Sequence, residues 1–453
     1  MCYSNKRNSL RIGIYGYGKS THSVLALLDE EKINYKLTYR SDNDDIPHLY
    51  NIERVFTKGN ALSEINEDIL FLSPSVRRDK TEFTEAIKKG VIISSDADIF
   101  SQYTKQRMFA VTGSDGKSST TELINSILNH SGKRALSCGN CGVPFTSVMK
   151  EDAIVVAELS SFQLMYTEFS PERALITNIT PNHLNWHKDF SEYANSKITL
   201  FKNARFRTID ADCDTTRTLS NNYKINSCAT LKYNFDEITK IIKADYYLTR
   251  KNDIILLNGE HLFTYRNAKR QEEYNIKNFM LAAATLINEV SADDIESVIS
   301  DFSGLPHRAE KFFTNEKISY INSSIDSTPT RTLSTLKSIE NKPIALIICG
   351  VGKGLDLSEF IKELPSLTKG AVLFGQFGEE VGELLKKMHK DYKFVFVSDM
   401  KEAIDAAENI LGDEGYVLLS PAATSFDMYK NFEERGNDFK NIVLNKYKIR
   451  KLK

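Results

Sequence analysis

The segment at residues 108–129, MFAVTGSDGKSSTTELINSILN, constrains the chain most strongly. An apolar run at its start predicts a buried strand, and apolar residues from Leu123 to Leu128 follow at helical spacing. The turn between them contains two glycines and ends in Lys-Ser. Glycines let the backbone wrap an anion, and the first free N–H groups of a helix point at it. The segment therefore predicts a phosphate-binding loop rather than an ordinary βα turn.

Two loops compete for the role of binding a nucleotide triphosphate. In the first, Lys117 can neutralise the outer phosphates and the Ser118 hydroxyl can hold Mg²⁺. This loop departs from the strict GxxxxGKS/T pattern, because only two residues separate Gly113 from Gly116. The strict pattern is met at residues 13–20, GIYGYGKS, where a glycine turn could hold a diphosphate. The residues alone leave both loops open.

Length and composition indicate a globular protein of about three domains, since the chain has 453 residues, 41% of them hydrophobic and 26% charged. The net charge of −1, from 59 basic and 60 acidic residues, gives no electrostatic reason to expect nucleic acid or a membrane surface as partner. No apolar run approaches the roughly 18 residues of a membrane span. We expect a cytoplasmic monomer that binds small molecules.

Strand and helix patterns alternate in three successive blocks, which predicts an α/β protein of three domains. We expect a Rossmann-like domain at residues 1–103, a central P-loop ATPase-type mononucleotide-binding domain at 104–303, and a C-terminal Rossmann-like α/β domain at 304–453. The predicted strands are residues 11–15, 35–39, 69–73, 90–94, 108–111, 153–157, 173–179, 253–257, 261–265, 318–322, 343–349, 371–374, 394–397 and 416–419.

Two residues in the central block follow apolar strands. Glu158 and His183 each lie just past a predicted strand, where open α/β sheets bind their ligands. With the Ser118 hydroxyl they could hold a hard cation beside the phosphates. His183 and His187 are four residues apart, but without an HExxH motif a zinc site is disfavoured. Lys197 lies in a helical stretch and, on sequence alone, is expected to be solvated.

One CxxC pair, Cys138 and Cys141, raises the possibility of a metal or redox site. A zinc site would need a second pair or histidines at ligand spacing, and a redox motif normally has a helix directly behind it. We therefore expect neither. In the last block Lys353 lies in a glycine turn that could bind an anion, and Phe432 is expected to be a core residue.

The chain resembles the Mur ligases, ATP-dependent enzymes that add amino acids to the peptidoglycan precursor. The resemblance covers residues 13–440, and its motifs stand in the order TGSDGKSS, GNCG, ELSSFQL, NITPNHL, YANSK, NIKNFMLAAA, GLPHRAE, GVGKGLD and LSPAATSFDMYKNFEERGNDF. ELSSFQL and the last motif are typical of the branch that adds D-glutamate. The resemblance implies domains for a uridine nucleotide, ATP and an amino acid, in that order. It assigns TGSDGKSS to ATP and the turn at residues 13–20 to the UDP diphosphate.

The resemblance also implies roles for single residues. Catalytic positions match Lys117, Glu158, His183 and Lys197, and two Mg²⁺ ions would be held by Ser118, Glu158, His183 and Lys197, the last as a carbamate. ATP-side positions match Gly113, Ser114, Asp115, Gly116, Lys117, Ser118, Ser119, Asn275, Asn278 and Arg308. Positions for UDP-N-acetylmuramoyl-L-alanine match Lys19, Ser20, Asn140, Ser160 and Gln163, and those for D-glutamate match Ser327, Lys353, Ser425, Phe426 and Phe432.

The largest departure from the family pattern lies in NSSIDSTPTRT, at residues 322–332. Ser323 stands where the family has an Asp for the ATP ribose, and Ile325 stands where it has a Lys. Asp326 is a candidate to replace the missing carboxylate. Two alternatives remain: another amide ligase of the superfamily, such as a folylpolyglutamate synthase or a Mur ligase for a different amino acid, and a non-catalytic nucleotide-binding protein.

Overall fold

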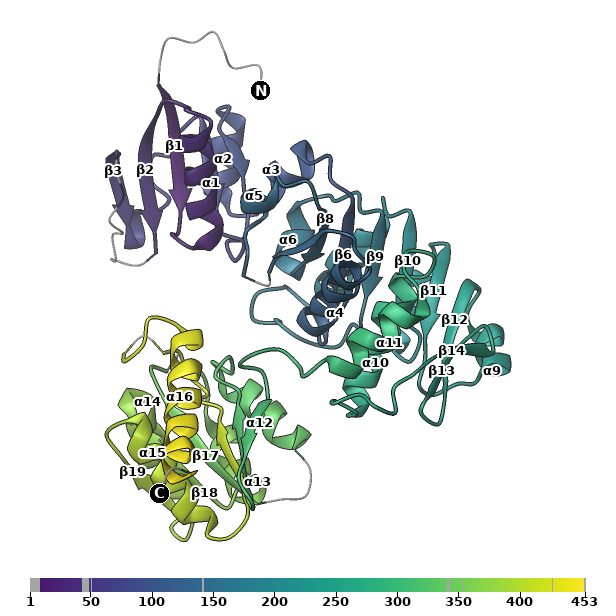
Figure 1. The fold of residues 1–453 in the computed structure, drawn as a ribbon. Helices are drawn as coiled ribbons and strands as arrows, with labels where there is room; N and C mark the ends of the chain where they lie inside the picture. Colours follow the sequence, from purple (N-terminus) through teal and green to yellow (C-terminus); the bar gives the residue numbers. More distant parts are fainter. Residues whose placement is uncertain are drawn as a thin grey trace. The chain divides into compact units, whose positions relative to one another are not determined.

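The computed structural model describes residues 9–42, 49, 51–140, 142–339, 343–352, 354–425 and 427–451. The chain divides into two compact units, Met1–Phe302 and Ser303–Lys453, and each is considered by itself. Figure 1 shows strands and helices alternating along the chain, with three separate sheets. This confirms the predicted α/β class.

The first sheet of the first unit is parallel throughout its described strands, which run in the order β3-β2-β1-β4-β5. These strands are β1 (Leu10–Tyr15), β2 (Tyr35–Ser41), β3 (Ile52–Thr57), β4 (Ile69–Leu72) and β5 (Ile92–Ser94). The helices are α1 (Lys19–Glu30), α2 (Thr81–Lys88), α3 (Asp96–Tyr103) and the 3₁₀ turn η1 (Lys58–Asn60). The strand order reverses beside β1, so the glycine turn after β1 opens into the crevice where such sheets bind nucleotides.

The second sheet has the order β14-β13-β12-β11-β10-β9-β6-β8-β7 among the described residues. It is parallel from β7 to β12 and antiparallel beyond, where Asn258-Gly259 closes the predicted hairpin. Its strands are β6 (Met108–Thr112), β7 (Ala135–Gly139), β8 (Ile154–Glu158), β9 (Arg173–Ile176), β10 (Phe206–Asp210), β11 (Ile225–Ala229), β12 (Ala244–Lys251), β13 (Ile254–Leu257) and β14 (Glu260–Thr264).

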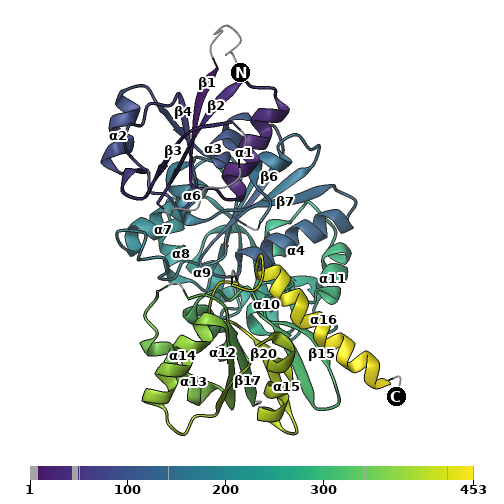
Figure 2. The same ribbon diagram turned by 90° about the vertical axis from the view of Figure 1, so that its left-hand side faces the viewer.

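Helices cover both faces of this second sheet (Figure 2). They are α4 (Lys117–His130), α5 (Phe145–Val148), α6 (Ser161–Tyr166), α7 (Phe190–Ile198), η2 (Thr199–Phe201), α8 (Asp214–Ser220), α9 (Phe235–Ile241), α10 (Glu273–Thr285) and α11 (Ala292–Asp301). Apolar residues of α4, α10 and α11 form one core with one face of the sheet, and those of α5, α6 and α7 form a second core with the other face. The β6 strand is buried between them, which explains its continuous apolar run.

The second unit contains the third sheet, with described strands in the order β15-β16-β20-β17-β18-β19. Only the β15–β16 pair is antiparallel among these strands. The strands are β15 (Glu310–Thr314), β16 (Ile318–Asn322), β17 (Ile344–Cys349), β18 (Gly370–Phe374), β19 (Phe394–Phe396) and β20 (Gly415–Leu419). The helices are α12 (Pro329–Ser338), α13 (Ser358–Leu367), α14 (Gly375–Met388), α15 (Met400–Leu411) and α16 (Phe432–Lys451).

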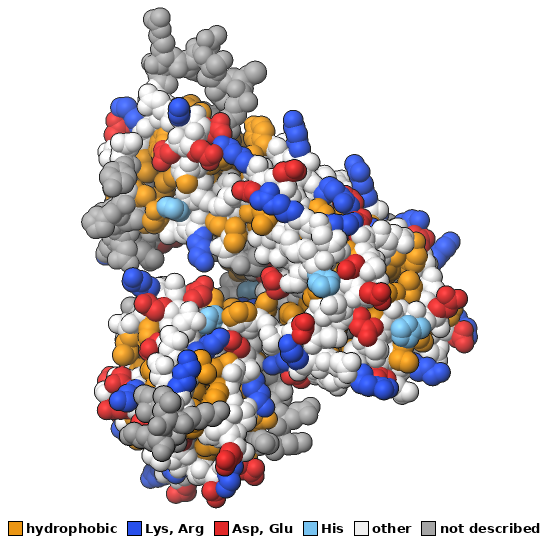
Figure 3. All heavy atoms as spheres, viewed as in Figure 1, with side chains coloured by type: hydrophobic (Ala, Val, Ile, Leu, Met, Phe, Trp, Pro, Cys, Tyr) orange, Lys and Arg blue, Asp and Glu red, His pale blue; other side chains and the backbone are white. Residues whose placement is uncertain are grey.

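On the face drawn in Figure 3, acidic and basic side chains are interspersed, in line with the net charge of −1. None of the helices among the described residues has the length and apolar character of a membrane span. Three residues discussed in the sequence analysis, Lys353, Phe426 and Cys141, lie outside the described residues.

Candidate active site

The predicted phosphate loop joins β6 to α4, and both of its glycines adopt positive φ angles. Gly113 has φ +151°, and a Cβ there would lie 1.9 Å from Thr177 Oγ1. Gly116 has φ +79°, and a Cβ there would lie 2.6 Å from Asn278 Oδ1. Side chains at these positions would be strained and would clash, so the loop needs glycine at both.

The lysine of this loop folds back over it. Lys117 Nζ donates to the carbonyl oxygens of Gly113 (2.9 Å) and Ser114 (2.8 Å). Ser118 and Ser119 follow in the first turn of α4, where backbone N–H groups lack partners within the helix. The loop thus combines an ammonium group, two hydroxyls and a helix N-terminus around one concave backbone, which suits an anion.

The segment after β9 braces the loop from the side. Ser114 N donates to Asn178 O (2.8 Å), and Asp115 N donates to Asn178 Oδ1 (2.9 Å). Ser114 Oγ lies 2.7 Å from the hydroxyl of Tyr193 on α7. Sequence reasoning missed Asn178 and Tyr193 as supports of the loop, although both lie inside motifs that it quoted, NITPNHL and YANSK.

Glu158, the last residue of β8, is buried at 1% exposure directly beside β6. Asn140 Nδ2 donates to its Oε1 at 2.7 Å. Its Oε2 has no hydrogen-bond partner among the described residues. A buried carboxylate oxygen without a donor is costly, and a cation would relieve that cost. Asn140, predicted to bind substrate, therefore orients Glu158.

Lys197 is buried at 2% exposure, so the prediction of a solvated lysine is wrong. It lies on the inner side of α7, with Nζ 4.7 Å from the centre of the Tyr193 ring and 3.5 Å from Thr112 Oγ1. Burial, helped by the nearby charge of Lys117, lowers the pKa of the Lys197 amine well below its ordinary value, and Glu158 only partly opposes this. Burial thus favours the neutral form of this amine, which lies near Thr112 at the end of β6.

His183 is an exposed residue with φ +54°, a conformation that is uncommon outside glycine. Its ring packs edge-on against Phe162, with 5.1 Å between ring centres. His187 is buried instead, and its Nε2 lies 2.9 Å from Ser161 Oγ. Burial lowers the pKa of His187. Among the described residues, no group of three or more His, Cys, Asp or Glu side chains could hold a metal ion.

A cavity of about 180 Å³ lies between the first and second sheets of the first unit. Its lining includes Lys19 and Ser20 at the start of α1, Asn140 after β7 and Gln163 on α6. Gln163 Oε1 accepts from Ser160 N (2.9 Å) and Ser160 Oγ (3.0 Å), which caps α6. The residues predicted to bind the uridine substrate are thus largely gathered at one cavity.

On α10, both predicted adenine-side residues are buried. Asn278 Oδ1 accepts from Thr120 Oγ1 at 3.3 Å and borders Gly116 of the loop. Asn275 Nδ2 donates to Glu272 Oε2 at 2.9 Å. This helix therefore touches the phosphate loop through Asn278.

In the second unit, the segments around Arg308 and Phe432 meet. The ring of His307, next to Arg308, packs edge-on against Phe432 with 6.0 Å between centres. Phe432 is half-buried rather than a full core residue. Ser425 is buried, and its carbonyl accepts from Tyr429 N at 2.9 Å. Ser327 N donates to Ile325 O at 2.8 Å within the divergent segment.

The altered segment uses Asp326 inside the fold. Its Oδ2 accepts from Thr335 Oγ1 (2.7 Å) and Ser420 Oγ (2.8 Å), and the residue is 5% exposed. Burial raises the pKa of this carboxyl. Asp326 thus anchors α12 to the end of β20, and this internal bonding argues against the idea that it replaces the ribose-binding carboxylate.

The site consists of a strand, a glycine loop and a helix in a mainly parallel sheet, beside a buried carboxylate. This arrangement is typical of a nucleotide-binding α/β core. The family described as "Mur ligase middle domain" matches residues 111–286. Among solved structures, UDP-N-acetylmuramate–alanine ligase from Thermotoga maritima shares the fold with a TM-score of 0.59 at 19% identity, over 96% of this chain and 100% of the other. The MurF ligase from Thermotoga maritima in complex with ADP gives 0.55 at 12% identity, over 98% and 96%.

Relatives with higher sequence identity define the class of protein more narrowly. UDP-N-acetylmuramoylalanine–D-glutamate ligase of Clostridium botulinum (strain 657 / Type Ba4) is 38% identical over 387 residues, which is 83% of this chain and 82% of the relative. The enzyme of the same name from Clostridium tetani (strain Massachusetts / E88) is 33% identical over 453 residues, 96% of each chain. The chain therefore belongs to the Mur ligase family, ATP-dependent enzymes of peptidoglycan precursor synthesis, in its UDP-N-acetylmuramoylalanine–D-glutamate ligase branch.

Proposed function

We propose that this protein joins D-glutamate to UDP-N-acetylmuramoyl-L-alanine with the hydrolysis of ATP, as a monomer in the cytoplasm. The names of its relatives suggest both substrates. The observation that carries the proposal is the grouping of the phosphate loop with Glu158 and Lys197, since one Glu158 oxygen lacks a hydrogen-bond partner among the described residues and burial lowers the pKa of the Lys197 amine. Of the two glycine loops, the one at residues 113–118 would bind ATP.

We assign each predicted residue a role in this reaction. Loop residues 113–119 would bind the triphosphate, with Asn275 and Asn278 on the adenine side and Arg308 near the phosphates. Lys19, Ser20, Asn140, Ser160 and Gln163 would face the uridine substrate, while Ser327, Lys353, Ser425, Phe426 and Phe432 would face D-glutamate. The three predicted domains, at 1–103, 104–303 and 304–453, would divide these tasks.

The site fits a divalent cation because Glu158 Oε2 is buried and has no donor among the residues that the structure describes. We propose that Glu158, Ser118, His183 and Lys197 hold two Mg²⁺ ions. Bound Mg²⁺ would neutralise the charge of the triphosphate and of the substrate carboxylate. Asn140 would keep Glu158 Oε1 occupied, so that only Oε2 is offered.

Lys197 suits carbamylation, because only a neutral amine is nucleophilic. Its nitrogen would attack the carbon of CO₂ and lose a proton, which yields a carbamate and converts a lysine into a carboxylate-like ligand. The depressed pKa of Lys197 supports this reaction, because it favours the neutral amine. A protonated lysine at this place would instead repel Lys117.

The chemistry then follows in two steps. An oxygen of the terminal carboxylate attacks the γ-phosphorus of ATP, and the bond to ADP breaks. The neutral amine of D-glutamate attacks the resulting acyl phosphate, and phosphate leaves as the amide forms. Lys117 and the N–H groups of the loop would hold the transferring phosphoryl group, and exclusion of water would protect the acyl phosphate.

Phosphate release from ATP tests the proposal directly. With UDP-N-acetylmuramoyl-L-alanine present, we expect release with D-glutamate and much less with L-glutamate, L-alanine or diaminopimelate. Lys117→Ala should stay folded and lose nearly all turnover, while Lys224→Ala, at an exposed pair with Asp245 (3.0 Å), should match the wild type. Preference for another amino acid would assign a different ligase, and no amino-acid-dependent release would point to a non-catalytic protein.

A further inference from the structure

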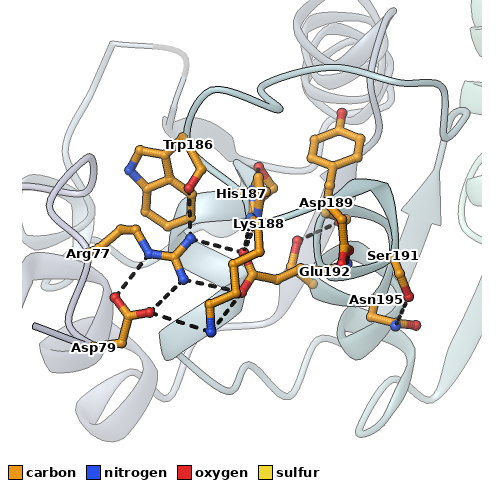
Figure 4. A network of polar contacts seen from close by, with 12 residues as sticks. Arg77, Asp79, Trp186, His187, Lys188, Asp189, Ser191, Glu192 and Asn195 are labelled. Carbon is orange, nitrogen blue, oxygen red and sulfur yellow. Dashed lines mark hydrogen bonds and ion pairs between the residues drawn. The ribbon is translucent and has the colours of Figure 1, made fainter.

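Two segments of the first unit that are distant in sequence meet at Arg77 (Figure 4). The Arg77 guanidinium is bonded to both oxygens of Asp79 (3.0 and 2.7 Å) and to both oxygens of Glu192 (3.0 and 3.2 Å). It also donates to Trp186 O at 2.7 Å. One side chain thus joins the loop after β4 to the segment that leads into α7.

Trp186 strengthens this junction and is the only tryptophan in the chain. Its indole Nε1 donates to Ser75 O at 2.6 Å, and the Arg77 guanidinium lies 4.9 Å from the ring centre. The Phe162 ring packs on it with 4.3 Å between centres. The indole is therefore fixed by both segments at once.

Glu192 extends the contacts of Arg77 to α7, which packs on the second sheet. It lies in the first turn of α7, and its Oε2 accepts from Lys188 N (2.9 Å) and lies 3.3 Å from His187 Nδ1. The Arg77 guanidinium lowers the pKa of Glu192 to about 2, so the carboxylate stays charged. His187 in turn reaches Ser161, at the start of α6.

The two segments that meet at Arg77 each contribute to the candidate active site: one borders the cavity, and the other leads to the phosphate loop. On one side, Pro74 lines the cavity of Lys19 and Gln163, one residue before Ser75. On the other side, α7 carries Tyr193, bonded to Ser114 of the phosphate loop, and Lys197. The loop after β4 has a second anchor, since Arg78 pairs with Asp98 (2.7 Å) and Arg78 N donates to Tyr166 OH. Loss of Arg77 would therefore loosen the junction without detaching the loop.

We propose that Arg77 is a positioning residue that, through Glu192 and Trp186, holds α7 and the segment of His183 against the wall of the substrate cavity. This inference rests on the proposed function for its kinetic consequence. The positions of Lys197 and of the phosphate loop then depend on the loop after β4, which borders the cavity proposed for the uridine substrate. Binding of that substrate and assembly of the catalytic groups become linked through one guanidinium.

Kinetics of Arg77→Ala test this role. In Arg77→Ala, kcat should fall roughly ten- to hundredfold, because the groups on α7 lose their exact placement. The KM for the uridine substrate should rise, and the KM for ATP should change less than about twofold. Arg77→Lys should recover part of the loss. Arg77→Ala combined with Glu192→Gln should be no worse than the poorer single variant, because both break one contact.

The matched control is Arg11→Ala, which removes an exposed arginine that pairs with Asp68 (3.0 Å) in the same sheet. It should keep wild-type kinetics. A lower melting temperature for Arg77→Ala with unchanged kcat and KM would overturn the proposal, since that result describes a purely structural residue. Additive losses in the double variant would overturn it as well.

Trp186 fluorescence decides the question without turnover. In the wild type, UDP-N-acetylmuramoyl-L-alanine should change the emission of Trp186, whereas in Arg77→Ala the free protein should already show shifted emission and a smaller response. Equal emission and equal response in both proteins would overturn the proposal. If the wild type released no phosphate with any amino acid, the proposed function would fail, while this titration would still support or refute the junction.

Discussion

Replacement of Lys197 by methionine should raise the stability of the protein while it removes turnover. The lysine is 2% exposed, and its hydrogen bond to Thr112 Oγ1 is long at 3.5 Å. Burial and the charge of Lys117 lower its pKa well below the ordinary 10.5. Folding therefore penalises the protonated form of this amine, and methionine avoids that cost.

The sign and size of the stability change expected for Lys197→Met follow from proton binding. Between the depressed pKa of the folded state and 10.5, the unfolded chain binds one proton more than the folded chain. The cost of Lys197 thus vanishes above pH 10.5 and grows by about 1.4 kcal/mol for each pH unit below it, until the folded amine also protonates. Apolar replacements of buried ion pairs are often neutral or stabilise proteins by about 1–4 kcal/mol, and we expect a gain of that order for Lys197→Met at pH 7.

Urea unfolding in CO₂-free buffer measures this gain, with the emission of Trp186 as the signal from the same unit. The advantage of Lys197→Met over the wild type should shrink as the pH rises from 7 to 10. Lys224→Met, at an exposed lysine, should differ little from the wild type at any pH. A less stable Lys197→Met at pH 7, or an advantage that does not change with pH, would refute the reasoning.

Four further outcomes are expected. Lys197→Ala should regain part of its phosphate release with short-chain carboxylates, and no recovery at any concentration would count against a carbamate. Glu158→Gln should keep its melting temperature but lose most Mg²⁺-dependent turnover, measured across a Mg²⁺ titration; full activity would exclude Glu158 as a ligand. Gly116→Ala should cost about 1–2 kcal/mol and raise the KM for ATP, because the new Cβ displaces Asn278. Arg40→Met should cost about 3–5 kcal/mol in urea unfolding, because it strands the buried Glu67 (2.7 Å away), whereas the exposed Arg54→Met should cost under about 1 kcal/mol.

The sequence predicts strands with continuous apolar runs well and strands rich in polar residues poorly, for a physical reason. Strands such as β6 are buried on both faces and read as continuous apolar runs. Six strands were not predicted individually, and each contains polar and exposed or half-buried residues: β3 (Ile52–Thr57), β7 (Ala135–Gly139), β10 (Phe206–Asp210), β11 (Ile225–Ala229), β12 (Ala244–Lys251) and β15 (Glu310–Thr314). Without an apolar run, their periodicity was too weak to distinguish them from loops.

Burial of Lys197 could have been inferred from helical spacing alone. Tyr193 and Lys197 are four residues apart on α7, so they share one face, and Tyr193 is buried. The charge of lysine suggested the opposite. The Arg77–Glu192 pair gives no such local signal, because its members are 115 residues apart and only the tertiary fold brings them together.

The carboxylate and the amine at the centre of the site do not satisfy each other. If Glu158 and Lys197 formed an ion pair, the pKa of the lysine would be raised, yet burial and Lys117 outweigh Glu158 and lower it. Glu158 Oε2 correspondingly lacks a donor among the described residues. A buried polar group without a hydrogen-bond partner costs about 1–3 kcal/mol. His183 adds the strain of a left-handed backbone conformation, with φ +54°. The Glu158 oxygen without a donor in the described part of the chain and the depressed pKa of the Lys197 amine therefore support the proposal that this site takes up a cation and forms a carbamate.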